Sequence, residues 1–490
     1  MSERLAFGYG TSGHSGDAPA RRLSLQSDPA FPGSTSPSVT TPAPPRSERA
    51  DWAFIGLMVF TGLLFFRPQD QIPALEALHL AEVSALGALL AMVIGRLGRG
   101  QPVSRVNPEL WGVVAMGALI LATAPFSIWP GGSLSTFTEI YSKIILIFIL
   151  MVNTLTSRKR VDQFLWLIVI ASGYIALRAV LDFAHGTNLV ENGRVRGAVG
   201  GVFKNPNDLA LNMVAIMPLA ASLALRAVSV LRRAGAAFCA VLMLGAIVVS
   251  QSRSGTIGLV VMVMILGAHL FRRKPALVMA GVLAMLLALP LVPSSYWHRL
   301  SSITDESQDD TGSREARQTL LRESLAAFVQ NPLTGVGAGQ FKNYDPQGRE
   351  QPWRESHNIV LQVAAELGIG GVVLLFFLVG RAALAAVQAQ RLLRRARGPR
   401  RRGRTAAPPA PGAITPEETE WFQGHTAAIT AALAGWFFCA LFASVAYNWT
   451  FYYLLALATA PRDILVDRLT PARARRTVRV AASALQEAGA

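Results

Sequence analysis

Two apolar runs meet across a short polar turn at residues 235–271, which read GAAFCAVLMLGAIVVSQSRSGTIGLVVMVMILGAHLF. Neither run carries a charged residue outside the turn and its edges. A helix that crosses the hydrocarbon core of a bilayer needs about 20 mostly apolar residues. The stretch therefore predicts two membrane-spanning helices that are joined at the membrane surface by the turn Ser250–Gly255.

Similar runs recur along the whole chain and indicate the fold class. Hydrophobic residues make up 51% of the 490 residues, charged residues only 16%, and the mean hydropathy is +0.37. Soluble globular proteins carry about 25% charged residues, so the composition predicts an all-α polytopic membrane protein. Twelve candidate spans lie near residues 52–66, 73–95, 109–127, 138–156, 162–183, 207–225, 235–250, 255–271, 276–293, 358–380, 425–445 and 448–465.

The basic residues indicate how these helices are oriented. Lys and Arg number 46 and Asp and Glu 30, which gives a net charge of +16. If the N-terminus is cytoplasmic, every strongly basic short loop falls on the same side, as the positive-inside rule requires. We therefore interpret the basic excess as a topology signal and not as a nucleic-acid-binding surface. The basic segments lie at residues 96–105, 158–160, 226–233, 272–274, 391–404 and 473–479.

The segments outside the helices differ in composition. Residues 1–50 are rich in Ser, Pro, Gly, Thr and Ala, which predicts a disordered cytoplasmic tail. The loop at 294–357 holds nine acidic and seven basic residues and has helical patterning in 313–329, so we expect an ordered subdomain on the outer face. The predicted order is a tail at 1–50, helices one to nine at 51–293, the outer loop at 294–357, helices ten to twelve at 358–465 with a basic cytoplasmic loop at 381–424, and a cytoplasmic tail at 466–490.

The first candidate binding segment is residues 185–210, HGTNLVENGRVRGAVGGVFKNPNDLA. Arg194 and Arg196 lie in a Gly-rich stretch, and Asn205 and Asn207 mark the start of a helix. Guanidinium groups fit phosphate oxygens, and helix N-termini favour anions, which indicates a pyrophosphate clamp. A capped helix preceded by a loop whose arginines face lipid headgroups explains the same residues equally well.

The second candidate is Arg253, in the short outer turn between two apolar runs. An arginine at this place opposes the positive-inside bias. Charged residues at membrane depth are costly and are usually functional or paired. We therefore favour a functional role over simple snorkelling of the side chain to the headgroups.

The third candidate is His357, where the outer loop re-enters the membrane. Asn358, Gln362 and Glu366 follow at a spacing of four residues and so share one face of a helix. A histidine near neutral pKa is the natural general base for a sugar hydroxyl, whereas a lone interfacial histidine more often only caps or anchors. Glu366 is better explained as a structural partner inside the bundle than as a catalyst.

Taken in order, these features resemble the O-antigen ligase and polymerase superfamily. The resemblance covers the region of roughly 180–380 through motifs and most of the remainder through helix layout. A shorter stretch, F-F-R-P-Q-D at 65–70, is similar to members from exopolysaccharide and exosortase-linked gene clusters. The matching elements are R-x-R-G at 194–197, F-K-N-P-N-D-L-A at 203–210, S-R-S-G at 252–255, N-P-L-T-G-V-G-A-G-Q-F at 331–341 and H-N-x-x-L-x-x-x-x-E-x-G-x-x-G at 357–371.

The resemblance implies a GT-C-like fold and a metal-independent, inverting glycosyltransferase that needs no cofactor. It implies transfer of a glycan from undecaprenyl diphosphate to a glycan, lipid A–core or protein acceptor, at the periplasmic face of the bacterial inner membrane. Arg194 or Arg196 would hold the pyrophosphate together with Arg253, and His357 would activate the acceptor hydroxyl. Further contacts are expected from Arg314, Arg317 or Arg322, with Asn205, Asn207, Asn358 and Glu366 in support.

A transporter or flippase of a polyprenyl-linked glycan is the alternative. Such proteins place polar groups at the bilayer midplane on broken helices, often in repeated halves. Here the candidate residues gather at the outer edge, and no internal repeat is evident. The chain also shows no Gly-rich nucleotide motif and no Asp-x-Asp pair for a metal. A donor that carries its own leaving group needs neither, so we favour the enzyme.

Overall fold

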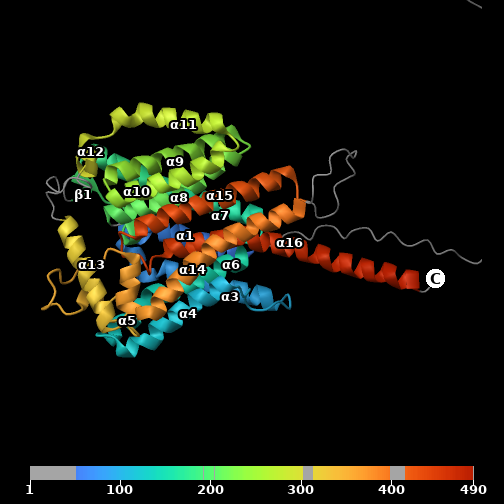
Figure 1. Cartoon of the computed structure of the whole chain (residues 1–490), viewed down its shortest axis with the longest axis horizontal. Helices are drawn as coiled ribbons and strands as arrows, with labels where there is room; N and C mark the ends of the chain where they lie inside the picture. Colours follow the sequence, from blue (N-terminus) through green and yellow to red (C-terminus); the bar gives the residue numbers. More distant parts are fainter. Residues whose placement is uncertain (1–50, 191–192, 204, 302–312, 398–413, 489–490) are drawn as a thin grey trace, which may run out of the picture. The chain divides into compact units, whose positions relative to one another are not determined.

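The computed structural model describes residues 51–190, 193–203, 205–301, 313–397 and 414–488. The predicted disordered tail at 1–50 lies outside the described residues, as does the second half of the basic run at 391–404, residues 398–404. Residues 50–490 form one compact unit, and its described part consists almost entirely of helices, which confirms an all-α fold (Figure 1).

Sixteen α-helices lie in the described part of the chain. They are α1 (Trp52–Phe66), α2 (Pro68–Gln71), α3 (Leu80–Leu97), α4 (Pro108–Thr123), α5 (Pro130–Ser135), α6 (Ser142–Thr154), α7 (Arg158–His185), α8 (Pro206–Arg226), α9 (Val230–Ser250), α10 (Arg253–Phe271), α11 (Pro275–Ala288), α12 (Ser294–Ser301), α13 (Ser313–Gln330), α14 (Ile359–Arg397), α15 (Pro416–Ala440) and α16 (Trp449–Ala488).

Short elements connect these helices. The strands β1 (Leu189–Val190) and β2 (Arg194–Val195) pair antiparallel, with Leu189 opposite Val195. A π-helical turn at Thr136–Tyr141 joins α5 to α6. Single 3-10 turns lie at Pro73–Leu78, Ala124–Phe126, Gly201–Phe203, Leu289–Leu291 and Phe341–Asn343.

Nine helical segments of the described residues are long and apolar enough to cross a membrane. They confirm a polytopic membrane protein. The predicted span at 276–293 is the shorter apolar helix α11. The last two predicted positions are occupied by α15 and α16, which are not among the nine. The total of twelve spans therefore stays a prediction.

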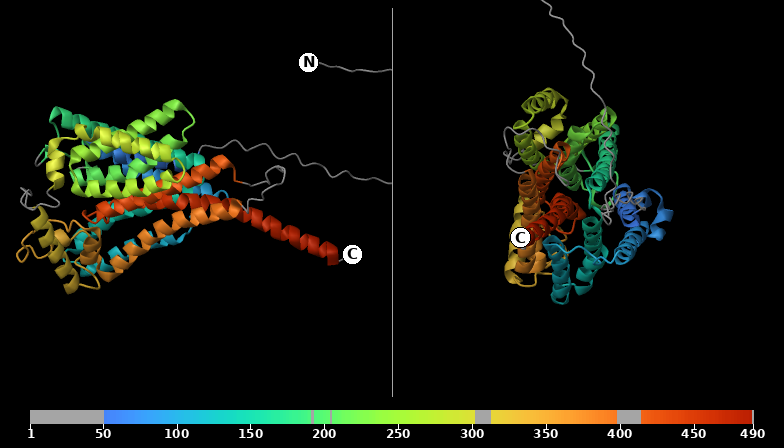
Figure 2. Two further views of the ribbon diagram at one scale, coloured as in Figure 1. Left: turned by 45° about the horizontal axis from the view of Figure 1, so that its top comes forward. Right: turned by 90° about the vertical axis from the view of Figure 1, so that its right-hand side faces the viewer.

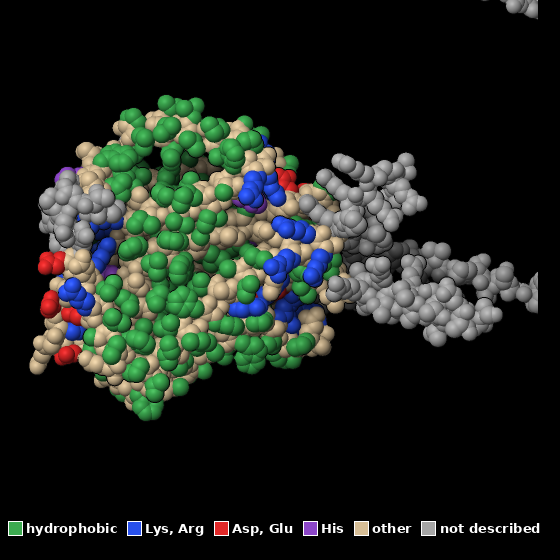
Figure 3. Space-filling view, viewed as in Figure 1, with side chains coloured by type: hydrophobic (Ala, Val, Ile, Leu, Met, Phe, Trp, Pro, Cys, Tyr) green, Lys and Arg blue, Asp and Glu red, His purple; other side chains and the backbone are tan. Residues whose placement is uncertain are grey.

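The burial pattern separates inner helices from outer ones. In α8, 72% of the most apolar window is buried, whereas the shorter helix α11 has no buried residue. Figure 3 shows apolar side chains along the flanks of the helices, where lipid would lie in a membrane. The flanks therefore have the surface that a bilayer requires, and the inner helices α7, α8, α14, α15 and α16 supply most of the core.

The two ends of the helix bundle differ in charge. One end, here termed the basic end, carries Arg158–Arg160, Arg226 and Arg272–Lys274, and Figure 3 shows Lys and Arg gathered there. The other, termed the mixed-charge end, is formed by the β1–β2 hairpin, α12, α13 and the loop at 331–358 (Figures 1 and 2). Helix α13 confirms the helical patterning predicted in the outer loop.

Candidate functional site

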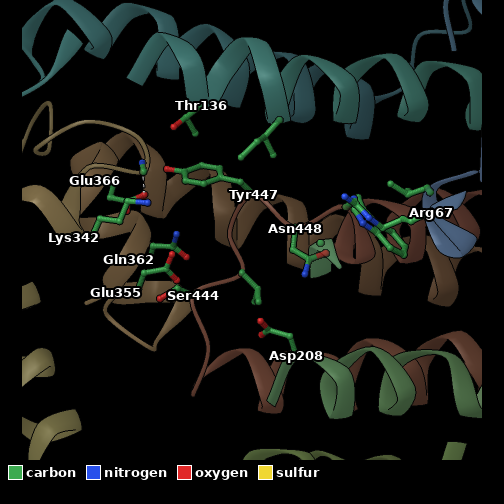
Figure 4. A pocket seen from close by; sticks show the side chains of 16 residues that line it. Arg67, Thr136, Asp208, Lys342, Glu355, Gln362, Glu366, Ser444, Tyr447 and Asn448 are labelled. Carbon is green, nitrogen blue, oxygen red and sulfur yellow. Dashed lines mark hydrogen bonds between the residues drawn. The ribbon is translucent and has the colours of Figure 1, made fainter. Parts of the chain in front are cut away.

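A cavity of about 520 Å³ lies where α1, α8 and α14 approach the segment before α16 (Figure 4). Three of the predicted motifs contribute to its wall, through Asp208, Gly339 and Glu366. The sixteen described residues that line it are Leu64, Arg67, Thr136, Ile140, Gly201, Asp208, Gly339, Lys342, Glu355, Gln362, Glu366, Ser444, Val445, Tyr447, Asn448 and Trp449.

Charges of both signs face this cavity. Asp208, Glu355 and Glu366 supply carboxyl groups, and Arg67 and Lys342 supply the cations among the lining residues. Figure 4 shows Arg67 on one side and Glu355, Glu366 and Lys342 together on the other. Within the described residues, no three His, Cys, Asp or Glu side chains form an arrangement that would hold a metal ion. Because the two cations lie on opposite sides of the cavity (Figure 4), the site can bind an anionic ligand on one side and a hydroxyl-bearing ligand on the other.

The wall near Glu366 depends on backbone contacts between the 331–341 motif and α14. The Val336 N–H donates to the Ala365 carbonyl at 2.8 Å, and the Ile369 N–H donates to the Pro332 carbonyl at 2.8 Å. Helix α14 breaks at Gly368, with φ 64° and ψ −160°. A side chain there would meet the Pro332 carbonyl at 2.5 Å, so the closeness of loop and helix requires glycine.

Glu366 lies at this junction and has two roles. Its Oε2 accepts a hydrogen bond from the Gly339 N–H at 2.9 Å, and its side chain also lines the cavity. The side chain is 4% exposed. A buried carboxyl group needs such a donor. Glu366 therefore fixes the loop that forms one wall of the cavity, which agrees with its interpretation as a structural partner inside the bundle.

The polar stripe on α14 anchors the segment between α15 and α16. Asn358 Nδ2 donates to the Leu441 carbonyl at 3.0 Å, while its Oδ1 caps α14 by accepting from the Val360 and Leu361 N–H groups. Gln362 Oε1 accepts from the Ala446 N–H at 3.1 Å. The stripe thereby brings residues 441–448, which contribute Ser444, Tyr447 and Asn448 to the cavity, against the re-entry point of the loop.

His357 lies at that re-entry point in the left-handed backbone region, with φ 51°. Its backbone N–H donates to Ser444 Oγ at 2.9 Å. Burial, together with the charges of Arg317 and Arg354, lowers the pKa of His357 to about 4. The imidazole is therefore neutral at pH 7. His357 adjoins the cavity through the contact of its backbone N–H with Ser444, but it is not among the described lining residues.

Glu355 is the acidic neighbour of His357 and does line the cavity. Burial raises the pKa of Glu355, although the charge of Lys342 and a hydrogen bond with Ser444 act in the opposite direction. The raised pKa brings this carboxyl group nearer to the range in which a general base works.

Arg194 joins three of the predicted segments by hydrogen bonds. Its side chain is buried, with Nε donating to the Ser250 carbonyl at 3.2 Å and Nη2 donating to Asn207 Oδ1 at 2.7 Å. Ser252 Oγ donates to the same Asn207 oxygen at 2.9 Å, and Asn205 Oδ1 caps α8 by accepting from the Asn207 N–H at 2.8 Å. The guanidinium thus connects β2, the start of α8 and the α9–α10 turn.

The other predicted arginines lie around this region. Arg196 is exposed after β2, and Arg253 is half-buried at the first residue of α10, beside Tyr296 and Leu300. Neither is among the sixteen described residues that line the cavity. Their binding of pyrophosphate stays a prediction.

The three predicted arginines of the outer loop all fall on α13. Arg317 is close enough to His357 for its charge to lower the pKa of that histidine, whereas Arg322 is exposed. The side chain of Arg314 lies outside the described part of the chain. The structure thus brings one of the three, Arg317, next to the candidate base.

Arg67 was not among the predicted site residues, although it belongs to the F-F-R-P-Q-D stretch. It lies directly after α1 and lines the cavity. The sequence did hold one signal for Arg67: it is a charged residue that ends an apolar run and is followed by Pro68. A membrane span ends at such a residue, which places it at the membrane surface. The segment at 441–448 had no comparable signal.

Comparison with known proteins now adds to this geometry. Residues 238–376 match the O-antigen ligase family. The match runs from α9 into α14 and contains Arg253, the 331–341 motif, His357 and Glu366. It confirms the superfamily resemblance and, with the nine apolar helices, supports a membrane glycosyltransferase of the O-antigen ligase or polymerase type. No curated protein matches the chain.

Proposed function

We propose that the protein transfers a glycan from undecaprenyl diphosphate to an acceptor hydroxyl at the periplasmic face of the bacterial inner membrane. The observation that carries this proposal is the cavity at the mixed-charge end, to which three motifs of the family resemblance contribute. The positive-inside rule puts the opposite, basic end in the cytoplasm. The acceptor is a glycan, a lipid A–core or a protein.

The reaction requires two kinds of group, and the cavity region has both. The acceptor oxygen attacks the anomeric carbon with inversion, the bond from that carbon to the diphosphate oxygen breaks, and the acceptor proton passes to a base. Fixed positive charges stabilise the departing diphosphate. Lys342 and Arg67 line the cavity, and Arg317 lies close to His357 beside it, so no metal is needed in this scheme.

His357 is our first candidate for the base. Its pKa of about 4 keeps the imidazole neutral and able to accept a proton at pH 7. Glu355 is the second candidate, because it lines the cavity and His357 does not. Arg194 then acts as a positioning residue, since its hydrogen bonds hold the α9–α10 turn that leads into Arg253.

Purified full-length protein and a lipid-linked glycan donor test the function. In detergent, without a gradient, the enzyme should form a new glycosidic bond to one of three offered acceptors: lipid A–core, a second lipid-linked repeat unit or a hydroxyl-bearing peptide. The productive acceptor separates ligase, polymerase and protein transferase. Movement of the donor across a vesicle membrane without any bond formation would instead support the transporter.

The sidedness is tested by reporters that are active only in the periplasm. A reporter inserted after Gly348, in the loop of the mixed-charge end, should be active, and one inserted after Arg273, at the basic end, should be silent. The reverse pattern would place the cavity in the cytoplasm and contradict the proposed donor side.

A further inference from the structure

We infer that Arg67, held in place by Asp70, binds the diphosphate group of the lipid-linked donor inside the cavity. This inference rests on the proposed function and adds a substrate-binding residue outside the region that matches the O-antigen ligase family. The backbone at the end of α1, the Arg67–Asp70 contact and the distribution of charge in the cavity each support it.

The backbone directs the Arg67 side chain out of the helix. The Arg67 N–H closes α1 by donating to the Leu63 carbonyl at 3.0 Å, and Arg67 itself has the left-handed φ of 41°. That conformation is disfavoured for a residue with a Cβ atom. Pro68 then begins α2 at once. The chain thus turns sharply at Arg67, and the guanidinium reaches the cavity instead of continuing along the apolar flank of α1.

Asp70 holds the guanidinium by a two-point contact. Arg67 Nε donates to Asp70 Oδ2 at 2.7 Å and Nη2 donates to Oδ1 at 3.1 Å. The Gly200 N–H donates to the same Oδ2 at 3.0 Å, which ties the pair to the Gly-rich loop before α8. A Cβ atom on Gly201 would lie 2.9 Å from Arg67 Nη1, so that loop passes directly over the third guanidinium nitrogen.

The pair is fixed but not closed to a ligand. The Arg67 and Asp70 side chains are 30% and 29% exposed. A guanidinium that is already oriented loses less freedom when it binds, and its planar N–H groups match phosphate oxygens. Arg194 differs in this respect, because it is 8% exposed and donates to Ser250 and Asn207.

The distribution of charge in the cavity favours the Arg67 side for a diphosphate. Figure 4 shows Arg67 apart from Glu355 and Glu366, which lie beside Lys342, the second lining cation. Glu355 and Glu366 repel a multiply charged anion at the Lys342 side, whereas the Asp70 carboxylate is already bound by Arg67 and the Gly200 N–H, so the diphosphate is better placed near Arg67. Leu64 and Trp449 line the same cavity and provide apolar surface for the first prenyl units.

The experiment is a titration of purified full-length protein in detergent with undecaprenyl diphosphate, with neutral undecaprenol as the reference lipid. Loss of a charged hydrogen-bond partner typically corresponds to about a 10–100-fold weaker affinity. We therefore expect Arg67→Ala and the bulkier Arg67→Gln to weaken diphosphate binding by about 10-fold or more. Arg67→Lys should retain part of the affinity, and Asp70→Asn should give an intermediate loss, because Arg67 stays but is no longer held.

The chain offers a matched control at the other end of the same helix. Arg160 pairs with Asp51, the N-cap of α1, at 2.7 Å, and the side chains are 29% and 30% exposed. Arg160→Ala should leave diphosphate binding unchanged. The inference is wrong if Arg67→Gln binds undecaprenyl diphosphate like the wild type, or if Arg160→Ala loses as much affinity as Arg67→Ala. It is also wrong if the wild type does not prefer the diphosphate to undecaprenol, or if excess phosphatidylglycerol displaces the diphosphate as well as unlabelled undecaprenyl diphosphate does.

The inference and the proposed function can fail separately. If the wild type transfers glycan while Arg67→Gln keeps the same donor KM, only the role of Arg67 is wrong. If Arg67-dependent binding of undecaprenyl diphosphate is found but no acceptor ever receives a glycan, the binding site stands and the transferase proposal falls.

Discussion

Both ends of the helix bundle pair arginines with carboxylates, but the two sites differ in burial. At the basic end, Glu109 is fully buried and receives Arg381 Nη2 at 2.7 Å and Arg462 Nη1 at 2.7 Å. At the mixed-charge end, the Arg67–Asp70 pair remains almost one-third exposed beside a cavity. The first site is closed and ties α4, α14 and α16 together, whereas the second remains accessible to a ligand.

This difference separates a structural use of charge from a chemical one. In the Glu109 cluster (Glu109, Arg381, Arg462 and Asp463), Arg462 donates to both Glu109 oxygens and to Asp463. Each charge there is balanced by protein groups. Removing one member of such a cluster is therefore expected to damage the fold, and removing a charge that faces the cavity is expected to damage transfer.

The largest effect is expected for the candidate base. His357→Gln should reduce the transfer rate by about 10²–10⁴, because glutamine cannot accept the proton. The base must be unprotonated, so wild-type activity should fall as the pH drops through the His357 pKa of about 4. His298→Gln, an exposed histidine on α12 at the same end, should keep the wild-type rate.

A parallel Glu355→Gln variant decides between the two candidate bases. If Glu355 takes the proton, its raised pKa places the acidic decline at higher pH than for an ordinary glutamate, and the decline should vanish in Glu355→Gln. In that case His357→Gln would retain most of the rate, and His357 would only position the loop through its contact with Ser444.

The next effect concerns the closed cluster at the basic end. Glu109→Ala leaves Arg462 and Arg381 near the core without their shared carboxylate, which typically destabilises a protein by about 3–5 kcal/mol. Denaturant unfolding of the purified protein should show this loss. The quadruple variant Glu109→Leu, Arg381→Met, Arg462→Met and Asp463→Asn should recover much of it, because no charge of the cluster is left unbalanced. A quadruple variant as unstable as Glu109→Ala would show that the cluster stabilises the fold through its ion pairs themselves.

The sequence predicted these regions unequally well. Apolar runs and basic loops predicted the helices, because lipid exposure and topology leave a strong composition signal. Three of the ordered motifs line one cavity through Asp208, Gly339 and Glu366, but of these three residues only Glu366 was a predicted site residue. The role of Arg194 could not be predicted, because its partners Ser250 and Asn207 are set by how β2, α8 and the α9–α10 turn pack.

Arg67 and the 441–448 segment show a second limit of the sequence. Each reaches the cavity through a break in helical structure: the left-handed turn after α1 and the irregular stretch between α15 and α16. Neither break has a regular spacing that would identify it. His357 holds Ser444 and Gln362 holds Ala446, in each case through a backbone N–H group. These contacts join residues about 85 positions apart, so no local sequence pattern can predict them.

A smaller effect is expected where the loop meets α14. Gly368→Ala puts a Cβ atom 2.5 Å from the Pro332 carbonyl at a positive φ, which should cost about 1–3 kcal/mol of stability. Transfer should also fall, because Gly339 and Glu366 depend on this junction. Gly380→Ala, on the same helix with open space around it, should be neutral. Equal loss in both variants would mean that α14 tolerates no substitution and that the junction is not special.

The smallest effect is expected for an exposed ion pair, and it tests whether burial is what distinguishes the two ends. Lys143 Nζ lies 2.7 Å from Glu82 Oε1, as short as the contacts of Glu109, but the side chains are 42% and 45% exposed. Water screens such a pair, so Lys143→Ala should change the unfolding free energy by no more than about 1 kcal/mol. Neither residue lines the cavity, so the transfer rate should also be unchanged. If Lys143→Ala destabilised the protein as much as Glu109→Ala, the distance between the charged atoms and not their burial would govern how much these ion pairs stabilise the fold. The contrast between a closed structural cluster and an open binding pair would then lose its physical basis.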